Sequence, residues 1–352
     1  MPKKKDDRKI ERWITVKGNH IPIYEGESES DAVFNFVNKQ IKDKQAKDDK
    51  KSKKEKVPDI PKRKSYRDIG KNFDDNSMQF YKDTGINMRI ENKRIFNEDL
   101  VYDAMDTLAD LQDKYHINSV PDPLANSGDR LQIIFCGQQD SWNSTKRFID
   151  KDGKEKDCFA NANYCSIALN PKYYSLTPEE LGEIYDKGVD KTFYNASPIG
   201  STYKDIVTHE VGHHLFDSWV VKQLEKTVDR KNVKFWDYYY DVQRYLTNDK
   251  NWVREKNPAT ALMNQLDDIW QDCIADLEKD KDVMKMLGRS SINMSITALA
   301  SPEWGLRKYT AVSTYAMTNY HEMFAEMFTD YYANGENAKL LTKIVMSKFG
   351  IK

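Results

Sequence analysis

The sequence predicts an α+β fold, in which a small mixed sheet is combined with a mostly helical body. Two short apolar runs bounded by turn residues, at 131–136 and 164–170, have the length and composition of buried strands. Apolar residues recur at helical spacing through much of the remaining sequence after residue 65. With 352 residues, the chain is long enough for two domains or for one domain with appendages.

Capping residues mark where two of the helices begin. Asn97 precedes an apolar stripe that predicts a helix to about residue 115. Thr177 and Pro178 open a second helix whose first turn is acidic. Further helices are predicted at about 202–221, after Pro258 and at about 318–348.

The N-terminal part is predicted to form a short module that is separate from this body. Residues 13–23 indicate a hairpin with its turn at Gly18 and Asn19, and a helix is expected at about 30–44. The residues that follow are almost all Lys, Asp and Glu, which cannot build a core. We therefore expect an N-terminal hairpin and helix module over 1–41, a charged flexible linker over 42–64 and a folded domain over 65–352.

The composition is that of a soluble protein, since 39% of the residues are hydrophobic, 32% are charged and the mean hydropathy is −0.80. No apolar run reaches the roughly 18 residues that a membrane helix needs. The N-terminus is polar and shows no signal peptide. The four cysteines lack C-x-x-C spacing, which fits a reducing compartment. We therefore expect no membrane partner.

Charge is distributed unevenly along the chain. Residues 1–70 contain 20 Lys and Arg against 13 Asp and Glu, a net charge of +7, whereas the whole chain carries −1. A solvated linker accounts for this mixed, lysine-rich segment, and a nucleic-acid-binding arm is the weaker interpretation. Nucleic acid is therefore not the expected partner.

The segment His209-Glu210-Val-Gly-His213 has the H-E-x-x-H spacing of zinc hydrolases. His209 and His213 are four residues apart, so on a helix both rings project from one face and can bind one metal ion. Glu210 lies beside them, where it can take a proton from a metal-bound water. We therefore expect Zn²⁺ as the cofactor, His209 and His213 as two of its ligands, and Glu210 as the general base.

A catalytic zinc site needs a third protein ligand, and the same helix offers weak candidates. Phe216 and Trp219 stand where a metzincin requires Gly and His, so that class is excluded. His214 points about 100° away from His213 around the helix. Asp217 lies four residues beyond His213 on the same face, where it would bind the metal or hold one of the imidazoles by a hydrogen bond.

The stronger candidate lies on a distant and mostly apolar helix. Glu322 and Glu326 are spaced i, i+4 there, beside Met323 and Met327. A buried carboxylate needs a partner, because an unpaired buried charge is costly, and a cation would satisfy this pair. We expect Glu322 to bind the zinc and Glu326 to hydrogen-bond around the site. Two glutamates on a solvated surface are the weaker alternative.

The segment from Tyr315 to Glu326, together with the H-E-x-G-H helix, resembles the catalytic domain of anthrax lethal factor and related gluzincin metallopeptidases. In that family, the first Glu of an E-x-F-A-E helix is the third zinc ligand. A tyrosine seven residues before that Glu, followed by a T-N pair, assists catalysis. Tyr315, Thr318, Asn319 and Glu322 stand at the matching positions. The resemblance implies a zincin-like metallopeptidase domain in which Tyr315 stabilises the developing negative charge.

This resemblance covers about residues 130–335. It implies that the strand at 164–170 is the edge strand above the metal, where a substrate peptide would pair through its main chain. The predicted substrate-binding residues on that strand are Tyr164, Ser166 and Ala168. Glu322 follows His213 by 109 residues, a longer separation than in lethal factor. We therefore interpret about 222–306 as a helical insert.

Residues 13–26 resemble a short module of phage head-morphogenesis and prophage-encoded proteins, many of which carry lethal-factor-like metallopeptidase domains. That resemblance implies a cytoplasmic or virion-associated protein with phage head proteins among its partners. The predicted function is a zinc-dependent endopeptidase that acts on a peptide or protein substrate. The alternative is a non-catalytic, head-associated structural protein that retains a zincin fold. Glu210 and Tyr315 argue against that alternative, because a scaffold has no chemical need for either.

Overall fold

The computed structural model describes residues 10–16, 19–24, 26, 64–90, 95–117, 131–135, 148, 153–154, 157–190, 202–248, 257–306 and 308–351. These residues form a mixed α/β structure that is mostly helical and contains two small sheets, in agreement with the predicted α+β class. The chain divides into two compact units, Met1–Arg63 and Lys64–Lys352. Within the described ranges, no helix is both long and apolar enough to cross a bilayer.

The first unit contains the predicted hairpin. Strands β1 (Ile10–Val16) and β2 (Asn19–Tyr24) pair antiparallel, with Val16 opposite Asn19 next to the turn. The hairpin therefore extends three residues beyond the predicted start at residue 13. The predicted helix at 30–44 and nearly all of the predicted linker at 42–64 lie outside the described residues.

The second unit contains a four-stranded mixed sheet with the order β3-β4-β6-β5. Its strands are β3 (Asn87–Ile90), β4 (Gln132–Phe135), β5 (Ala160–Ala162) and β6 (Ser166–Leu169). Strands β3, β4 and β6 run parallel, whereas β5 is antiparallel to β6. All four residues of β6 are buried, because this strand has a neighbour on each side. Both apolar runs that predicted strands are therefore confirmed, as β4 and β6.

Capping groups fix the start of the helices as the sequence predicts. The Asn97 side chain accepts a hydrogen bond from the Asp99 backbone N–H at 2.9 Å, and α3 (Glu98–Tyr115) begins there. Thr177 and Glu180 form a reciprocal capping box, with distances of 2.9 and 3.2 Å, at the start of α6. The remaining elements before the motif helix are η1 (Tyr66–Asp68), α2 (Phe73–Thr84), α5 (Pro171–Tyr174) and α6 (Pro178–Asp190).

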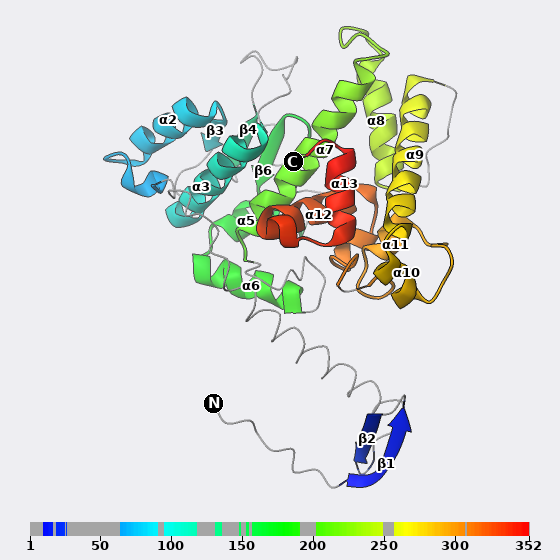
Figure 1. The fold of residues 1–352 in the computed structure, drawn as a ribbon. Helices are drawn as coiled ribbons and strands as arrows, with labels where there is room; N and C mark the ends of the chain where they lie inside the picture. The colour runs from blue at the N-terminus through cyan, green and yellow to red at the C-terminus, as the bar shows by residue number, and fades with distance from the viewer. Residues whose placement is uncertain are drawn as a thin grey trace. The chain divides into compact units, whose positions relative to one another are not determined.

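Helix α7 (Asp205–Leu224) carries the H-E-x-x-H motif and is buried over most of its surface. Helix α12 (Tyr320–Asn334) packs along it, as Figure 1 shows. Phe216 of α7 stacks on Phe324 of α12 with ring centroids 4.5 Å apart and an interplanar angle of 14°. This aromatic contact and the apolar surface around it hold the two helices together.

The segment predicted as an insert at 222–306 folds into helices that share the core of this unit. They are α8 (Phe235–Leu246), α9 (Pro258–Glu278), α10 (Lys281–Leu287) and α11 (Ile296–Leu299). Helix α8 packs against α7 and α9 (Figure 1), and α9 also packs against α13 (Leu340–Lys348). Trp270 of α9 stacks on Tyr320 of α12, with centroids 5.3 Å apart. The insert is therefore part of the wall around the motif helix.

The predicted helix at 318–348 is two helices. Helix α12 ends before η3 (Gly335–Asn337), where Gly335 has a φ of 51°, and α13 follows. A positive φ is readily adopted by glycine and stops a helix. Asp330 then accepts hydrogen bonds from the Lys339 backbone N–H and the Thr342 hydroxyl, at 2.9 and 2.7 Å, which ties α13 back to α12.

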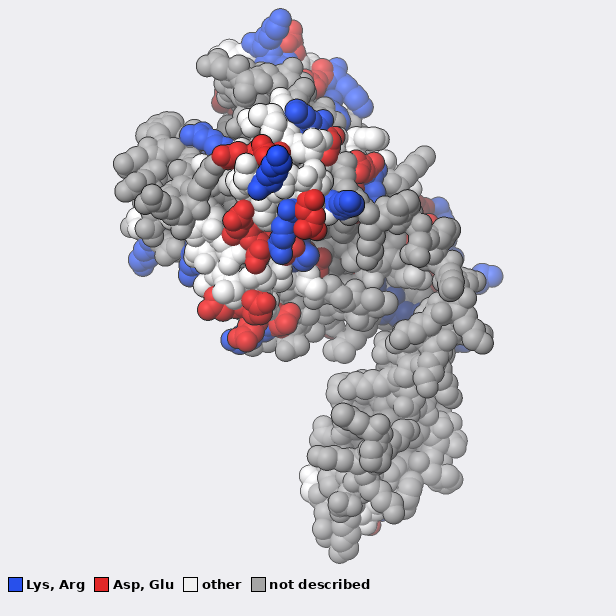
Figure 2. Space-filling model, turned by 90° about the vertical axis from the view of Figure 1, so that its left-hand side faces the viewer, with Lys and Arg blue, Asp and Glu red and all other residues white. Residues whose placement is uncertain are grey.

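The surface on the α2 side of the molecule mixes both signs of charge. Figure 2 shows acidic and basic side chains interspersed on this face, with no broad region of one sign among the coloured residues. A nucleic-acid backbone is usually bound by a clustered basic patch. Among the coloured residues, this face has no such patch.

Candidate metal centre

The close approach of α7 and α12 depends on Gly212. A Cβ atom added at Gly212 would lie 2.8 Å from the Ala325 Cα and 3.2 Å from the Phe328 Cβ. The two helices therefore touch backbone to backbone at Gly212, which lies within the H-E-x-x-H motif. Small residues at a crossing point permit such an approach, and it brings the first turn of α12 against the motif of α7.

We expect Gly212→Ala to destabilise the protein, although alanine favours a helix by about 1 kcal/mol over glycine. The added methyl group overlaps backbone that cannot turn away, and overpacking of this kind costs about 1–3 kcal/mol. Urea unfolding of the full chain measures the effect. Gly182→Ala in α6 is the matched control, since its Cβ would meet only Tyr203 at 3.7 Å. Equal stability changes in the two variants would contradict a close helix crossing at Gly212.

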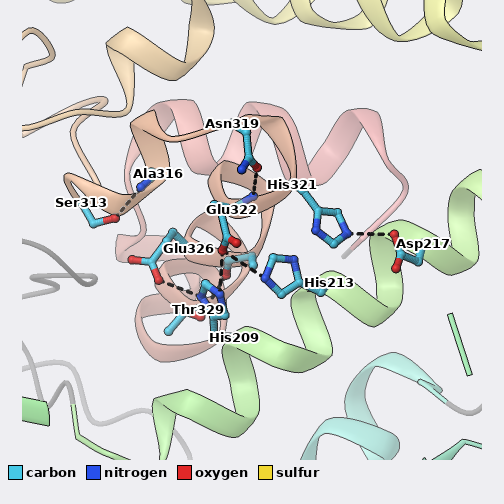
Figure 3. A network of polar contacts seen from close by, with 11 residues as sticks. His209, His213, Asp217, Ser313, Ala316, Asn319, His321, Glu322, Glu326 and Thr329 are labelled. Carbon is cyan, nitrogen blue, oxygen red and sulfur yellow. Dashed lines mark hydrogen bonds and ion pairs between the residues drawn. The ribbon is translucent and has the colours of Figure 1, made fainter. Parts of the chain in front are cut away.

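Three potential metal ligands converge at this crossing, as Figure 3 shows. His209 Nε2 and His213 Nε2 each lie 3.1 Å from the same oxygen, Glu322 Oε2. All three ligand atoms lie within 4.8 Å of one another. In a tetrahedral site with bonds of about 2.0–2.2 Å, ligand atoms are about 3.3–3.6 Å apart. The three side chains are therefore a group that could hold a metal ion with little movement.

Glu322 is positioned by the cap of its own helix. The Asn319 side chain accepts a hydrogen bond from the Glu322 backbone N–H at 2.8 Å, so Glu322 lies in the first turn of α12. Burial would raise the pKa of Glu322, but the two histidines hold this pKa well below its usual value. The carboxylate is thus ionised and available to a cation.

The hydrogen bonding of His209 also fits a metal ligand. Its Nδ1 lies 2.8 Å from Glu326 Oε1, while its Nε2 faces Glu322. A neutral imidazole has one N–H and can donate to only one of these carboxylates. Burial lowers the pKa of His209, but Glu322 and Glu326 outweigh it and hold this pKa well above the usual value. A metal ion at Nε2 would take the place of that second proton.

The predicted general base and the predicted tyrosine lie beside this group. Glu210 is 6% exposed, and its Oε2 has no hydrogen-bond partner within the described residues. Burial raises the pKa of Glu210 to about 7. Tyr315, in η2 (Tyr315–Met317), stacks on His209 with ring centroids 5.9 Å apart, and its hydroxyl hydrogen-bonds to Glu322. Burial raises the pKa of Tyr315, so the hydroxyl keeps its proton.

Asp217 hydrogen-bonds to an imidazole, as predicted, but that imidazole belongs to His321 and not to either predicted metal ligand. Its Oδ1 lies 2.8 Å from His321 Nε2 and accepts a hydrogen bond from Gln243 Nε2 at 2.7 Å. His321 precedes Glu322 on α12, and its ring stacks on that of His213 with centroids 4.1 Å apart. No motif in the sequence assigns a role to His321. Its position next to the predicted third ligand was the one available signal.

His214 faces away from the centre, as its angle around the helix predicts. Its Nε2 lies 2.6 Å from the Ile117 carbonyl oxygen and its Nδ1 lies 3.1 Å from the Asn163 carbonyl oxygen. These contacts tie α7 to the end of α3 and to the turn between β5 and β6. His214 is therefore a structural residue.

The predicted edge strand at 164–170 is not an edge. Its regular part, β6, is paired with β4 on one side and with β5 on the other, so its main chain is not available to a peptide. Ser166 is 3% exposed, Ala168 is fully buried, and neither lines the cleft. Tyr164 does line the cleft, where it stacks on Trp236 of α8 at 4.7 Å. Among the described strands, β5 forms this edge, and it packs against α7.

A cleft of about 600 Å³ opens over the three ligands. The β5 segment lines one wall, and Tyr239, Tyr240 and Gln243 of α8 line another. Six of its lining residues are carboxylic acids, namely Asp157, Asp205, Glu210, Asp217, Glu322 and Glu326. No lysine or arginine is among the described residues that line it. Two of these acids have basic partners, since Asp157 pairs with Lys172 and Asp217 with His321, each at 2.8 Å. The lining is therefore acidic but partly neutralised.

Comparison with known proteins identifies no relative. No protein-family model, no curated protein and no solved structure matches this chain. The chemistry of the centre is therefore inferred from its own residues.

Proposed function

We propose that this chain is a zinc-dependent endopeptidase with a zincin-like fold of the gluzincin type. The observation that supports this best is the convergence of His209 Nε2, His213 Nε2 and Glu322 Oε2 on one point, beside the buried Glu210. Two nitrogen ligands and one carboxylate, with space for a water, are the donor set of catalytic zinc. The resemblance of both motifs to lethal factor supports the same assignment.

The chain's own residues supply the rest of the chemistry. Bound zinc would lower the pKa of a coordinated water to about 7 and polarise a carbonyl oxygen. Glu210 would accept the proton of the attacking water and deliver it to the leaving amine, and a pKa of about 7 suits transfer in both directions. The Tyr315 hydroxyl would turn from Glu322 and donate to the oxygen of the scissile carbonyl as it becomes negative.

The cleft indicates the class of substrate. Strand β5 (Ala160–Ala162) is the edge of the sheet among the described strands and lies beside α7, so an extended peptide would add to β5 by main-chain hydrogen bonds. Asp157 pairs with Lys172, Asp217 pairs with His321, and a pKa of about 7 leaves Glu210 partly protonated. Asp205, Glu322 and Glu326 therefore remain, three negative charges against the two positive charges of a zinc ion. Such a field concentrates cationic ligands, and salt screens it. We propose peptides with Lys or Arg near the scissile bond, with phage head proteins among the natural candidates.

Zinc binding is expected to release about one proton at pH 7. Without metal, His209 is protonated there, because its pKa is held well above the usual value, and the proton must leave before Nε2 binds zinc. As the pH falls below the pKa of His209, affinity should drop about tenfold per pH unit. Below about pH 4 the slope should double, since His213 then protonates too. Calorimetry in two buffers of different ionisation enthalpy measures this release. An uptake of protons, or no release, would contradict the assigned state of His209.

Tyr315→Phe is expected to lower kcat by roughly 10²–10³, the usual effect of removing one oxyanion donor. KM should change less, because the hydroxyl acts on charge that develops during the reaction. Steady-state kinetics on one peptide measures both constants. Tyr240→Phe is the control, since this tyrosine also lines the cleft but is 58% exposed and lies on α8. An unchanged kcat in Tyr315→Phe would remove Tyr315 from the proposed mechanism.

The proposed function is tested by cleavage of a mixed peptide library with the zinc-loaded full chain, with and without a chelator. We expect cleavage that the chelator abolishes and that added zinc restores. Stoichiometric zinc with no cleavage of any peptide would favour the non-catalytic, head-associated structural protein instead.

A further inference from the structure

The two histidines of the metal centre are oriented by different contacts. The Nδ1 of His209 lies 2.8 Å from Glu326, a carboxylate that fixes the ring by a hydrogen bond. The Nδ1 of His213 is buried and has no hydrogen-bond partner within the described residues. A metal-ligating histidine almost always donates its second ring N–H to a partner that fixes its plane. Another contact must therefore fix the plane of the His213 ring.

That contact is the ring of His321. The His321 and His213 rings are nearly parallel, with an interplanar angle of 23° and centroids only 4.1 Å apart. Phe216 lies 6.0 Å from His321, also nearly parallel at 28°. Figure 3 shows His321 alongside His213, between the first turn of α12 and Asp217 of α7. The His213 ring therefore cannot rotate freely about its Cβ–Cγ bond.

His321 is itself held firmly. Its Nε2 lies 2.8 Å from Asp217 Oδ1, and the Asp217 side chain is 2% exposed. Asp217 also accepts hydrogen bonds from Gln243 Nε2, at 2.7 Å, and from the Tyr239 hydroxyl. Both of those donors come from α8. The Asp217 carboxylate thus joins α7, α8 and α12 at one buried point.

We propose that His321 is a positioning residue, which fixes the plane of the metal ligand His213 by ring stacking and is itself fixed by Asp217. This inference rests on the proposed function, because it requires a metal at His209, His213 and Glu322. Stacking takes the place of the usual hydrogen bond to the second nitrogen. It also gives α8, which forms a wall of the cleft, a path of direct contacts to the metal centre.

The test is metal affinity in the full chain carrying His321→Gln. Glutamine keeps a donor near the position of Nε2 for Asp217 but has no ring to stack. Loss of a residue that orients a metal ligand usually costs 10–100-fold in affinity. We expect a 10–100-fold weaker zinc dissociation constant, measured by competition with a chromophoric chelator. We also expect altered visible bands of bound Co²⁺, and metal-free protein that still unfolds cooperatively but at a lower temperature, because the buried ring is lost.

His214→Gln is the matched control. It makes the same His-to-Gln change at a residue that follows the ligand His213 on α7 but faces away from the metal centre. It should lower stability and leave zinc affinity unchanged. His321→Phe should restore affinity to within about threefold of wild type, because the ring returns, although Asp217 loses a donor.

Wild-type affinity in His321→Gln would overturn the positioning role while leaving the metal centre intact. If His321→Gln fails to fold, His321→Phe decides, and a 10–100-fold loss in that variant overturns the proposal. If wild-type protein binds neither zinc nor Co²⁺, the proposed function itself fails, and this inference fails with it.

Discussion

Glu322→Ala is expected to lose most of the bound metal. Glu322 Oε2 is the atom that both His209 Nε2 and His213 Nε2 face at 3.1 Å, so its removal leaves two ligands for an ion that needs three. Loss of an outer partner alone costs 10–100-fold in affinity, so loss of this ligand should cost more than about 100-fold. Plasma mass spectrometry of dialysed protein measures the metal content, and chelator competition measures the affinity.

Glu336→Ala is the matched control for Glu322→Ala. It makes the same change at an exposed glutamate in η3, directly after α12. It should retain full metal content. If Glu322→Ala also retained full metal content, the third ligand would be elsewhere, and Glu326 would be the next candidate because it lies 2.8 Å from His209.

Glu210→Gln is expected to abolish most turnover while the zinc stays bound. Glutamine has the same shape but cannot accept the proton of the attacking water, and general-base catalysis contributes about 10²–10⁴ in rate. Both kcat and kcat/KM should fall by that factor, because the lost interaction acts in the transition state. Single-peptide kinetics at matched zinc content measures this.

The fold should tolerate Glu210→Gln well. Glu210 is 6% exposed, and burial raises its pKa to about 7, so ionisation costs free energy in the folded, metal-free protein. A neutral side chain of equal size should leave thermal unfolding unchanged or shift it upward. Turnover equal to wild type at equal zinc content would assign the activity to another site or to a contaminant.

The metal ligands were predictable because their signals are local. His209 and His213 share a helix face by spacing alone, and Glu322 stands out as a carboxylate on an apolar helix. The structure brings these groups together across 113 residues of sequence from His209 to Glu322. The helix caps at Asn97 and Thr177 were equally local, and both are confirmed.

The prediction that residues 164–170 form an edge strand was wrong, because strand pairing is not a local property. β5 has three residues, and its Ala-Asn-Ala sequence lacks the β-branched and aromatic residues that are typical of strands. The sequence at 164–170 is a good strand, but nothing in it tells which neighbours it will have. The short β5 covers the side that was expected to be free.

The sequence could not identify which imidazole Asp217 binds, for a related reason. The i, i+4 spacing from His213 places Asp217 correctly on the motif helix, and the carboxylate does bind an imidazole. That imidazole belongs to His321, on a helix that arrives from more than a hundred residues away. The axial register of two packed helices depends on contacts such as Gly212 with Ala325, which sequence spacing does not reveal.

The proposed function and the role of His321 both require that His209, His213 and Glu322 form one zinc centre. Anomalous diffraction from crystals of the zinc-loaded full chain, recorded on both sides of the zinc absorption edge, tests it most directly. We predict one strong peak about 2.0–2.2 Å from His209 Nε2, His213 Nε2 and Glu322 Oε2. A zinc peak bound to other side chains, or no peak at these three atoms, would show that they do not form the zinc centre.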